Sequence, residues 1–467
     1  MPAKLSKFIV ETANCKDYVH PWVNSCVMAQ VGLGLHALQE SLRVYSTVYI
    51  LTLLMRGKTP SKNDILRTIL GILQSTAFLS WSALTYPAFI CLLRRILGHF
   101  NILTVSFLPA FLSSLSAILI ERPSRRPLLC LYVANIATET LFRMGVWRGY
   151  FKEIPYANVG IFAASMATLL YFFRSKSSKQ DSIFKIIKLM VGPYENPDYV
   201  ETRRLSPEPS TSKHEDNPFS DKISSRIKLN TSLNLLQKSL KTYRNLINWI
   251  KCSGKHRTCP HPYSCSSFIL GGSIKLFSIG LCIQLGLKLA FQVKQLLSKP
   301  GVLKAELCKK DNFNLALFLG GFSGIYRLLS CLLRRTFNKN SKMHAIPAGL
   351  LASVAFLMFP NNTIALYVMW KALQLSWNKG VENRIVPEVK WFVIFLYCFS
   401  TAVLFHAAII EPQNLRASYW KFLLSLSGGR VAAMARVPLD PFGLESSKYV
   451  EEVMTKTKTP RNFNFSF

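Results

Sequence analysis

The sequence has 467 residues, of which half are hydrophobic and only 17% are charged, a balance typical of a membrane protein. Lysine and arginine number 57 against 24 aspartates and glutamates, which gives a formal net charge of +33. Because the cations mostly stand in short runs between long apolar segments, we expect them to face anionic lipid headgroups, and we expect no nucleic-acid partner.

Residues 1–26 form a leader in which a cysteine precedes a His-Pro-aromatic triplet and a Ser-Cys pair, and residues 252–266 form a second leader of this kind. Thiolate and imidazole are ligands that zinc prefers, but no Cys-x-x-Cys pair is present. Structural thiols or disulfides are therefore the first interpretation, and a zinc site built from both leaders is the alternative. No other cofactor is expected. The candidate ligands are Cys15, His20 and Cys26 in the first leader, and Cys252, His256, Cys259, His261 and Cys265 in the second.

Residues 27–174 are predicted to form a first membrane repeat. About 20 apolar residues are needed to cross a bilayer as a helix. The segment 27–55 is weak, because only residues 44–55 are continuously apolar, so it either spans or lies in the interface. We therefore expect four or five membrane helices in this half. The apolar segments are 27–55, 69–93, 102–120, 128–145 and 159–173.

The segment 128–145 carries two opposite charges four residues apart, Glu139 and Arg143, which share one helix face. One interpretation is a structural pair near a helix end, with the arginine reaching toward the headgroups. The other is a polar lining for a translocation path. Gln374 and Asn378 occupy the aligned positions of the second half, which weakens a catalytic role for the charges more than a lining role.

Residues 175–222 are rich in proline, serine and charge, and are predicted to be a disordered hydrophilic linker. Residues 223–251 follow as a basic amphipathic helix, since apolar residues recur at alternating spacings of four and three with lysines around them. Such a helix lies on an anionic membrane surface or packs on the bundle or a partner.

Residues 267–411 are predicted to be a second copy of the membrane repeat. Residues 91–95 (CLLRR) return letter for letter as residues 331–335, and further short matches keep the same order. The block closes one apolar span in each half, so its arginines are predicted to anchor helix ends at the headgroups. These anchors are Arg94, Arg95, Arg334 and Arg335.

Small residues recur four apart in the second half, as at Gly320 and Gly324. They predict close helix packing within the chain, with homo-oligomerisation as the alternative. The last part, residues 412–467, is predicted to be an interfacial segment and tail, because residues 415–423 mix aromatics and cations.

The predicted fold class is all-α, a polytopic helical membrane protein built from two homologous halves of four to five membrane helices each. Five spans per half would give the halves opposite orientations, and four would make them parallel.

Five motifs resemble the transmembrane protein 135 family, also called peroxisomal membrane protein 52. They are residues 40–43 (ESLR), 117–122 (AILIER), 137–145 (ATETLFRMG), 344–346 (HAI) and 418–423 (SYWKFL). The two leaders resemble the family's cysteine-rich region. That family is related to the four-helix subunits of mitochondrial inner-membrane translocases and to a 24-kDa peroxisomal membrane protein. The family has no established catalytic residues, so none is transferred.

The resemblance implies a non-enzymatic, multi-pass protein of mitochondrial and peroxisomal membranes. Such a protein would support the balance of mitochondrial fission and fusion, peroxisome organisation and lipid metabolism. Its basic cytosolic face would recruit fission machinery as a partner. A transporter or translocator of a lipid or metabolite is the alternative. No His-Glu-x-x-His arrangement or nucleotide-binding loop occurs, so we expect no enzyme.

Overall fold

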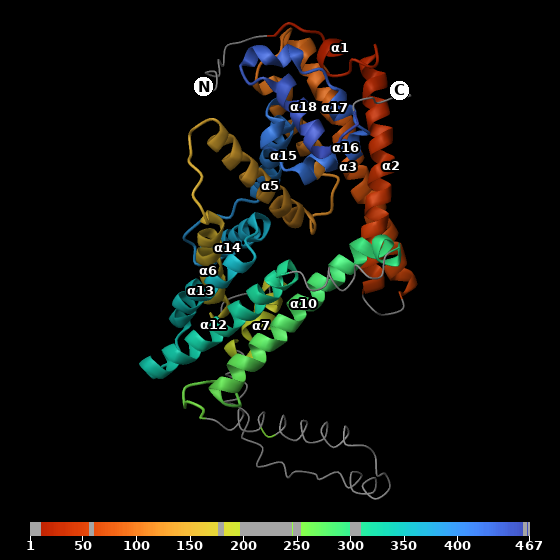
Figure 1. Ribbon diagram of the computed structural model, residues 1–467. Helices are drawn as coiled ribbons and strands as arrows, with labels where there is room; N and C mark the ends of the chain where they lie inside the picture. Colours follow the sequence, from red (N-terminus) through yellow and green to blue (C-terminus); the bar gives the residue numbers. More distant parts are fainter. Residues whose placement is uncertain are drawn as a thin grey trace, which may run out of the picture. The chain divides into compact units, whose positions relative to one another are not determined.

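The computed structural model describes residues 11–55, 60–175, 182–196, 245, 254–298, 310–460 and 465. These residues form helices, and no strand occurs among them, as expected for the predicted all-α class (Figure 1). The one β-bridge in the described part joins Glu11 to Phe100. The predicted amphipathic helix 223–251, apart from Asn245, lies outside the described residues, as does most of the linker.

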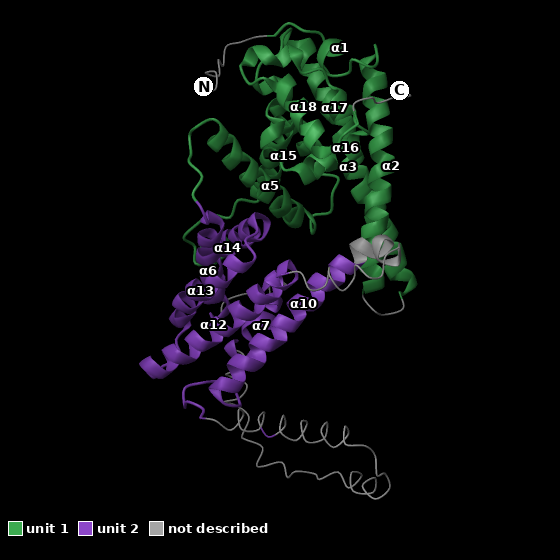
Figure 2. Cartoon of the chain, viewed as in Figure 1, with its two compact units in different colours: residues 1–154, 377–467 green, residues 155–376 purple. Residues whose placement is uncertain are grey.

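The chain divides into two compact units (Figure 2). Unit 1 comprises Met1–Ile154 and Trp377–Phe467, and unit 2 comprises Pro155–Ser376. The units do not coincide with the predicted repeats. Helix α6 (Ala157–Phe173), the last segment of the first predicted repeat, lies in unit 2. Helix α15 (Phe392–Ile410), the last segment of the second, lies in unit 1.

Unit 1 is a bundle in which α15 packs on both α4 and α5, while α2 and α3 lie side by side. Its core joins Phe78 of α3 and Ile136 of α5 to Leu404 of α15. The other helices here are α1 (Cys15–Tyr18), α2 (Cys26–Met55), α3 (Lys62–Leu97), η1 (Leu103–Phe107), α4 (Leu108–Ile118), α5 (Arg126–Trp147), η6 (Pro412–Asn414), α16 (Ala417–Ser427), α17 (Arg430–Ala433), η7 (Val437–Phe442) and α18 (Ser446–Thr457).

The ends of α3 follow from local sequence. Ser61 is the N-cap, and its side chain accepts a hydrogen bond from the Asp64 amide at 3.2 Å, while the Asp64 carboxylate accepts from the Ser61 amide. The helix ends at Gly98, whose φ of 76° is the left-handed conformation that glycine adopts without strain. Pro123 lies between α4 and α5, as predicted, whereas Pro127 is the second residue of α5, where a helix tolerates proline.

The predicted interfacial anchor at residues 415–423 is wrong, because its aromatic face is buried in unit 1. Trp420 is fully buried, and Tyr419 and Leu423 pack with it in the core formed by α5 and α15. The exposed residues of this stretch of α16 are Ala417, Ser418, Lys421 and Phe422. The helical period therefore separates a core face from a cationic face, and the mixture that looked interfacial is an amphipathic helix.

Unit 2 is held together by a long antiparallel contact between α10 and α12 and by α6 against α13. Phe162 of α6 stacks on Phe356 at 4.2 Å between ring centroids. Gly320 and Gly324 of α12 face Ser273 of α10, which confirms the predicted intramolecular role of this small-residue pair. The other elements are α7 (Ser182–Val191), η2 (Pro193–Glu195), α10 (Cys265–Ser298), η3 (Lys310–Phe313), α12 (Asn314–Phe337), η4 (Lys342–His344), α13 (Ala345–Ala352), η5 (Ser353–Met358) and α14 (Asn362–Glu382), which continues into unit 1.

The predicted disordered linker is wrong for residues 182–196, which contain α7 and η2. Ile183, Phe184, Ile187 and Met190 are buried in the unit 2 core. Ile183, Ile187 and Met190 are spaced by four and three residues, with Phe184 beside them, and so form one apolar face. The prediction from composition missed this face because prolines and charges surround it.

Four helices among the described residues are long and apolar enough to cross a membrane: Lys62–Leu97, Cys265–Leu289, Lys310–Phe337 and Phe392–Ile410. The sequence predicted eight to ten spans. Part of the difference arises because Leu103–Ile118, Ala157–Phe173 and Lys342–Met358 are apolar but shorter, and α2, α5 and α14 are long but are not among the four. At about 1.5 Å per residue, the shorter helices fall short of a hydrocarbon core of about 30 Å.

Candidate functional site

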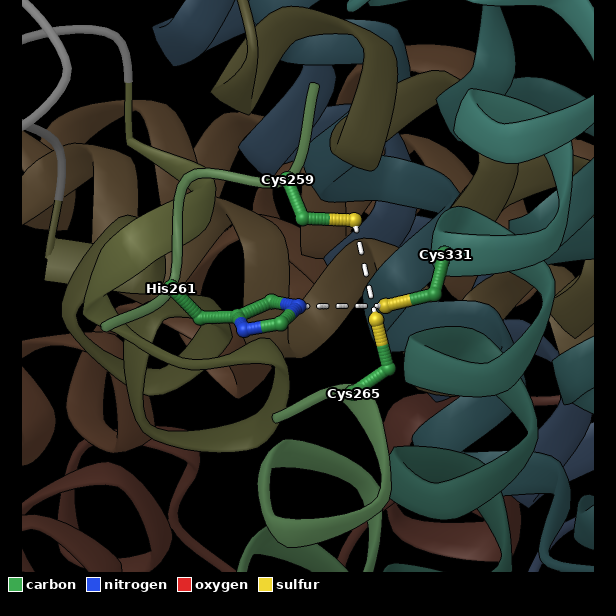
Figure 3. A group of neighbouring side chains, drawn as sticks. All are labelled: Cys259, His261, Cys265 and Cys331. Carbon is green, nitrogen blue, oxygen red and sulfur yellow. Dashed lines mark hydrogen bonds between the residues drawn. The ribbon is translucent and has the colours of Figure 1, made fainter. Parts of the chain in front are cut away.

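Four metal-ligating side chains meet in unit 2: Cys259, His261, Cys265 and Cys331 (Figure 3). Their ligand atoms all lie within 4.8 Å of one another, and all but Cys265 are buried residues. Cys259 and His261 come from the segment before α10, Cys265 is the first residue of α10, and Cys331 lies on α12. We call this group the unit 2 cluster.

The spacings in the unit 2 cluster are those of ligands around one ion. The Cys259 and Cys265 sulfurs are 3.9 Å apart, and His261 Nε2 lies 3.5 Å from Cys331 Sγ. A tetrahedral zinc ion with Zn–S of about 2.3 Å and Zn–N of about 2.0–2.1 Å separates two sulfurs by about 3.8 Å and nitrogen from sulfur by about 3.5 Å. A disulfide would need about 2.05 Å.

The imidazole of His261 is fixed in place. Its Nδ1 lies 2.6 Å from the carbonyl oxygen of Tyr263, and its ring stacks on Phe268 at 4.7 Å. The Nδ1–H therefore donates to that carbonyl, which leaves the Nε2 lone pair directed at the thiols, the arrangement that orients metal-binding histidines.

The thiol of Cys259 is poised to ionise. Hydrogen bonding from Cys331 and, after it, from His261 outweighs burial and lowers the pKa of Cys259 to about 4. The thiolate is the form that binds a metal.

Unit 1 contains a matching group, which we call the unit 1 cluster. The sulfurs of Cys15, Cys26 and Cys91 lie within 4.8 Å of one another. His20 Nε2 lies 3.2 Å from Cys26 Sγ, and its Nδ1 is 2.9 Å from the carbonyl oxygen of Val23. A hydrogen bond donated by the Cys91 thiol is the largest cause that lowers the pKa of Cys15 to about 7. This histidine too is buried and tied to a carbonyl a few residues on.

The predicted single site built from both leaders is wrong, because each leader forms a cluster within its own unit. The prediction missed Cys91 and Cys331, since apolar surroundings made them look like core thiols. The signal was present in the sequence, because both open the doubled CLLRR block. His256 is directed elsewhere, with Nδ1 2.8 Å from Thr258 Oγ1, and Cys252 lies outside the described residues.

The arginines of the doubled block divide into two kinds. Arg94 and Arg334, three residues after the cluster cysteines, make internal contacts. Arg94 donates to the carbonyl oxygens of Thr12 and Ala13 in the first leader. Arg334 is fully buried, so its predicted place at the headgroups is wrong. Arg95 and Arg335 are exposed, and their anchoring role stays a prediction.

Arg334 is buried because it forms a two-pronged ion pair with Glu195. Its two terminal nitrogens lie 2.9 and 2.6 Å from the Glu195 carboxylate oxygens, and Arg174 approaches to 3.7 Å. Burial alone would raise the pKa of Glu195, but the guanidinium groups of Arg334 and Arg174 hold it below its ordinary value. Glu195 therefore pairs with the arginine that lies three residues after Cys331 of the unit 2 cluster on α12.

The polar residues predicted for a translocation path do not all belong to one unit. Glu139 pairs with Arg143 at 2.6 Å, and Arg416, just before α16, donates to its second oxygen. Glu139 is buried by these contacts, while Arg143 is partly exposed. Gln374 accepts from Lys371 at 2.9 Å in unit 2, whereas Asn378 lies in unit 1. The sequence did not identify Arg416 as a partner.

Unit 1 also encloses an apolar pocket of about 240 Å³ between α2, α3, α5, α15, α16 and α17. Its walls are mainly aliphatic and aromatic side chains, among them Phe78, Ala83 and Tyr397. Arg430 contributes a cationic group, and His20 of the unit 1 cluster lies in the wall. Apolar walls with a few polar groups are the general character of small-ligand sites.

The long apolar helices and the two Cys/His clusters define an α-helical membrane protein. Residues 12–146 match the family model for the N-terminal cysteine-rich region of Transmembrane protein 135. The matched region contains the whole of the unit 1 cluster and supports membership of the transmembrane protein 135 family. No solved structure matches the chain.

Proposed function

We propose that the chain is a non-enzymatic protein of mitochondrial and peroxisomal membranes whose direct activity is to bind an acyl lipid. Through this activity it supports lipid metabolism, the balance of mitochondrial fission and fusion, and peroxisome organisation, with fission machinery as a partner. The family match and the apolar helices support the membrane class. The apolar pocket of unit 1 is the observation that carries the lipid-binding step.

The pocket suits an acyl chain with an anionic end. Its exposed lining is overwhelmingly apolar, so a hydrocarbon chain would gain about 25 cal/mol per Å² removed from water. Arg430 in the wall would pair with a carboxylate or phosphate, and the Tyr397 ring and its neighbours would bound the chain.

The test is the affinity of the detergent-purified protein for a fluorescent long-chain fatty acid. Ala83→Phe places a ring in the pocket and should weaken binding at least tenfold. Leu70→Phe adds a similar ring to an exposed position of the same helix and should leave the affinity unchanged. Arg430→Gln should weaken binding of the acid but spare the corresponding methyl ester. Equal binding by Ala83→Phe and the unaltered protein would refute lipid binding in this pocket.

The cellular roles are tested separately. Cells lacking the protein should show altered mitochondrial length and peroxisome number, and Ala83→Phe should fail to restore them. Restoration by Ala83→Phe would mean that the cellular roles do not depend on the pocket.

Transport of a lipid or metabolite is the second candidate. It would require the polar face of α5 to line a path, yet Glu139 is engaged by two arginines, which favours a structural role. Flux into proteoliposomes decides between them. Flux abolished by Glu139→Gln with Arg143→Gln, in a variant that still binds the fatty acid, would favour transport.

The two predicted halves gain support from the positions of corresponding elements. In unit 1, α15 packs on α4 and α5, although α6 is the helix that follows α5 in the sequence. In unit 2, α6 packs on α13, although α6 ends the first predicted repeat. We propose that the halves are homologous and that each lends its last helix to the other unit. The relation to mitochondrial translocase subunits and to the 24-kDa peroxisomal protein belongs to the same proposal.

A further inference from the structure

We propose that the unit 2 cluster is a structural zinc site with three cysteine ligands and one histidine, and that the unit 1 cluster is a second site of the same composition. In unit 1 the thiols are those of Cys15, Cys26 and Cys91. His20 contacts Cys26 but is not within 4.8 Å of all three sulfurs, so as the fourth ligand it would move toward the other two when the ion binds. Four protein ligands close the coordination sphere, which is the mark of a structural rather than a catalytic zinc.

The unit 2 geometry argues against two simpler explanations. A disulfide between Cys259 and Cys265 is excluded by the 3.9 Å between their sulfurs, and it would leave the Cys331 thiol beside an imidazole. Core packing explains buried cysteines among apolar side chains, as for Cys130 and Cys398. It does not explain an imidazole turned by a carbonyl until its free nitrogen faces three sulfurs.

The second cluster adds support. Its residues are entirely different, yet they again comprise three cysteines and a histidine whose Nδ1 contacts a backbone carbonyl. In both units two ligands flank a His-Pro-aromatic triplet, and another is the cysteine that opens the CLLRR block. If the halves are homologous, both copies have kept the cysteines and the histidine at these positions, as a metal site in each unit would require.

Each zinc would fasten a leader to the end of a membrane helix. In unit 2 it joins the segment carrying Cys259 to the first residue of α10 and to Cys331 near the end of α12. Thr258 beside the site also donates to the carbonyl oxygen of Arg334 at 3.3 Å. In unit 1 the ion joins α1, the start of α2 and α3. Binding of zinc releases the thiol protons and stabilises the folded form alone.

His261 also lines a pocket of about 580 Å³ that includes Lys185, Lys188 and Arg327. The unit 2 site therefore borders this pocket at His261.

Metal analysis of the full-length protein, purified under reducing conditions, tests the proposal. We expect two zinc ions per chain, one in Cys331→Ser, one in Cys91→Ser and none in the double variant. Cys282→Ser, which removes an exposed thiol of α10 outside both clusters, is the matched control and should keep two. Less than a fifth of an ion per chain in the unaltered protein, or unchanged zinc in the double variant, would overturn it.

A second measurement separates loss of metal from loss of fold. His261→Cys retains four soft ligands and should keep its zinc, whereas His261→Ala should bind it at least tenfold more weakly in a competition titration with a chelator. Cobalt replacing zinc should give thiolate-to-cobalt charge-transfer bands that Cys331→Ser halves. A folded protein in which alkylating reagent modifies every cluster thiol equally with and without chelator would contradict a bound metal.

Discussion

Glu195 shows how much a single residue decides in unit 2. Its side chain is fully buried and is neutralised by Arg334, with Arg174 close by, so the three charged side chains form one ion-pair network. Replacing it by an apolar or neutral residue leaves two guanidinium groups without their counter-charge in the interior. Removing one partner of a buried pair typically costs about 3–5 kcal/mol.

We therefore expect Glu195→Gln to lower the free energy of unfolding by about 3–5 kcal/mol. Asp311→Asn makes the same chemical change at an exposed acidic residue of unit 2 and should change it by less than about 0.5 kcal/mol. Thermal unfolding in detergent micelles measures both. Equal unfolding temperatures for the two variants would show that the ion pair contributes no net stability.

The same carboxylate predicts a pH dependence. Its folded pKa lies below the ordinary glutamate value of about 4.3, so its contribution is complete above that value and is lost as the pH falls through the folded pKa. The difference in unfolding temperature between the unaltered protein and Glu195→Gln should be constant from pH 7 to about 5 and shrink below about 4. A difference that grows on acidification would contradict this sign.

The contact between α10 and α12 depends on glycine. A Cβ on Gly280 would lie 2.8 Å from the Cα of Ala316 and 3.1 Å from its nitrogen, and backbone atoms cannot rotate away. The two helices therefore pack at a distance that only a hydrogen side chain permits at this position.

Gly280→Ala should separate α10 from α12 at a cost of about 1–3 kcal/mol. Gly286→Ala, on the same helix with nothing within 4 Å of the added carbon, should be neutral or slightly stabilising because alanine favours a helix. Protease sensitivity of α10 and thermal unfolding distinguish them. A Gly286→Ala variant as unstable as Gly280→Ala would mean that helix propensity, not close packing, sets the effect.

Helix positions were largely predictable at this scale, because residues 69–93 and 391–410 are long apolar runs and Pro123 lies in the break between α4 and α5. Contacts between distant segments were not. Glu195 as the partner of Arg334, and α7 as a core helix, depend on tertiary packing that no local pattern records. The two Cys/His clusters were predictable in part. Each leader contributes three of its candidate ligands to a cluster, whereas the cysteines on α3 and α12 lie in apolar segments and were not predicted.

At the scale of the whole molecule, each unit takes a helix from a remote part of the chain. The core of unit 1 contains Cys398, Leu404 and Ala407 of α15, packed on α4 and α5. Unit 2 takes α6 in the same way, with Phe162 and Leu169 fully buried. Removal of either helix would expose a large apolar surface.

Separate fragments of residues 1–222 and 223–467 should therefore be degraded when expressed alone and should accumulate when expressed together. Immunoblotting of membranes measures the amounts. A second fragment shortened to residues 223–390 lacks α15 and should fail to stabilise the first. Full accumulation of each fragment alone would contradict the exchange of helices.

Unit 1 cannot complete its fold until α15 has been translated. Its α5 ends at Trp147, but α15 ends only at Ile410. At roughly 5–20 residues per second, the intervening chain takes on the order of 10–50 s to synthesise. Unit 2 needs nothing beyond residue 376, so it is complete first. The earliest-made helices are thus the last to be enclosed, and a mutation or truncation near the carboxyl end damages the amino-terminal bundle.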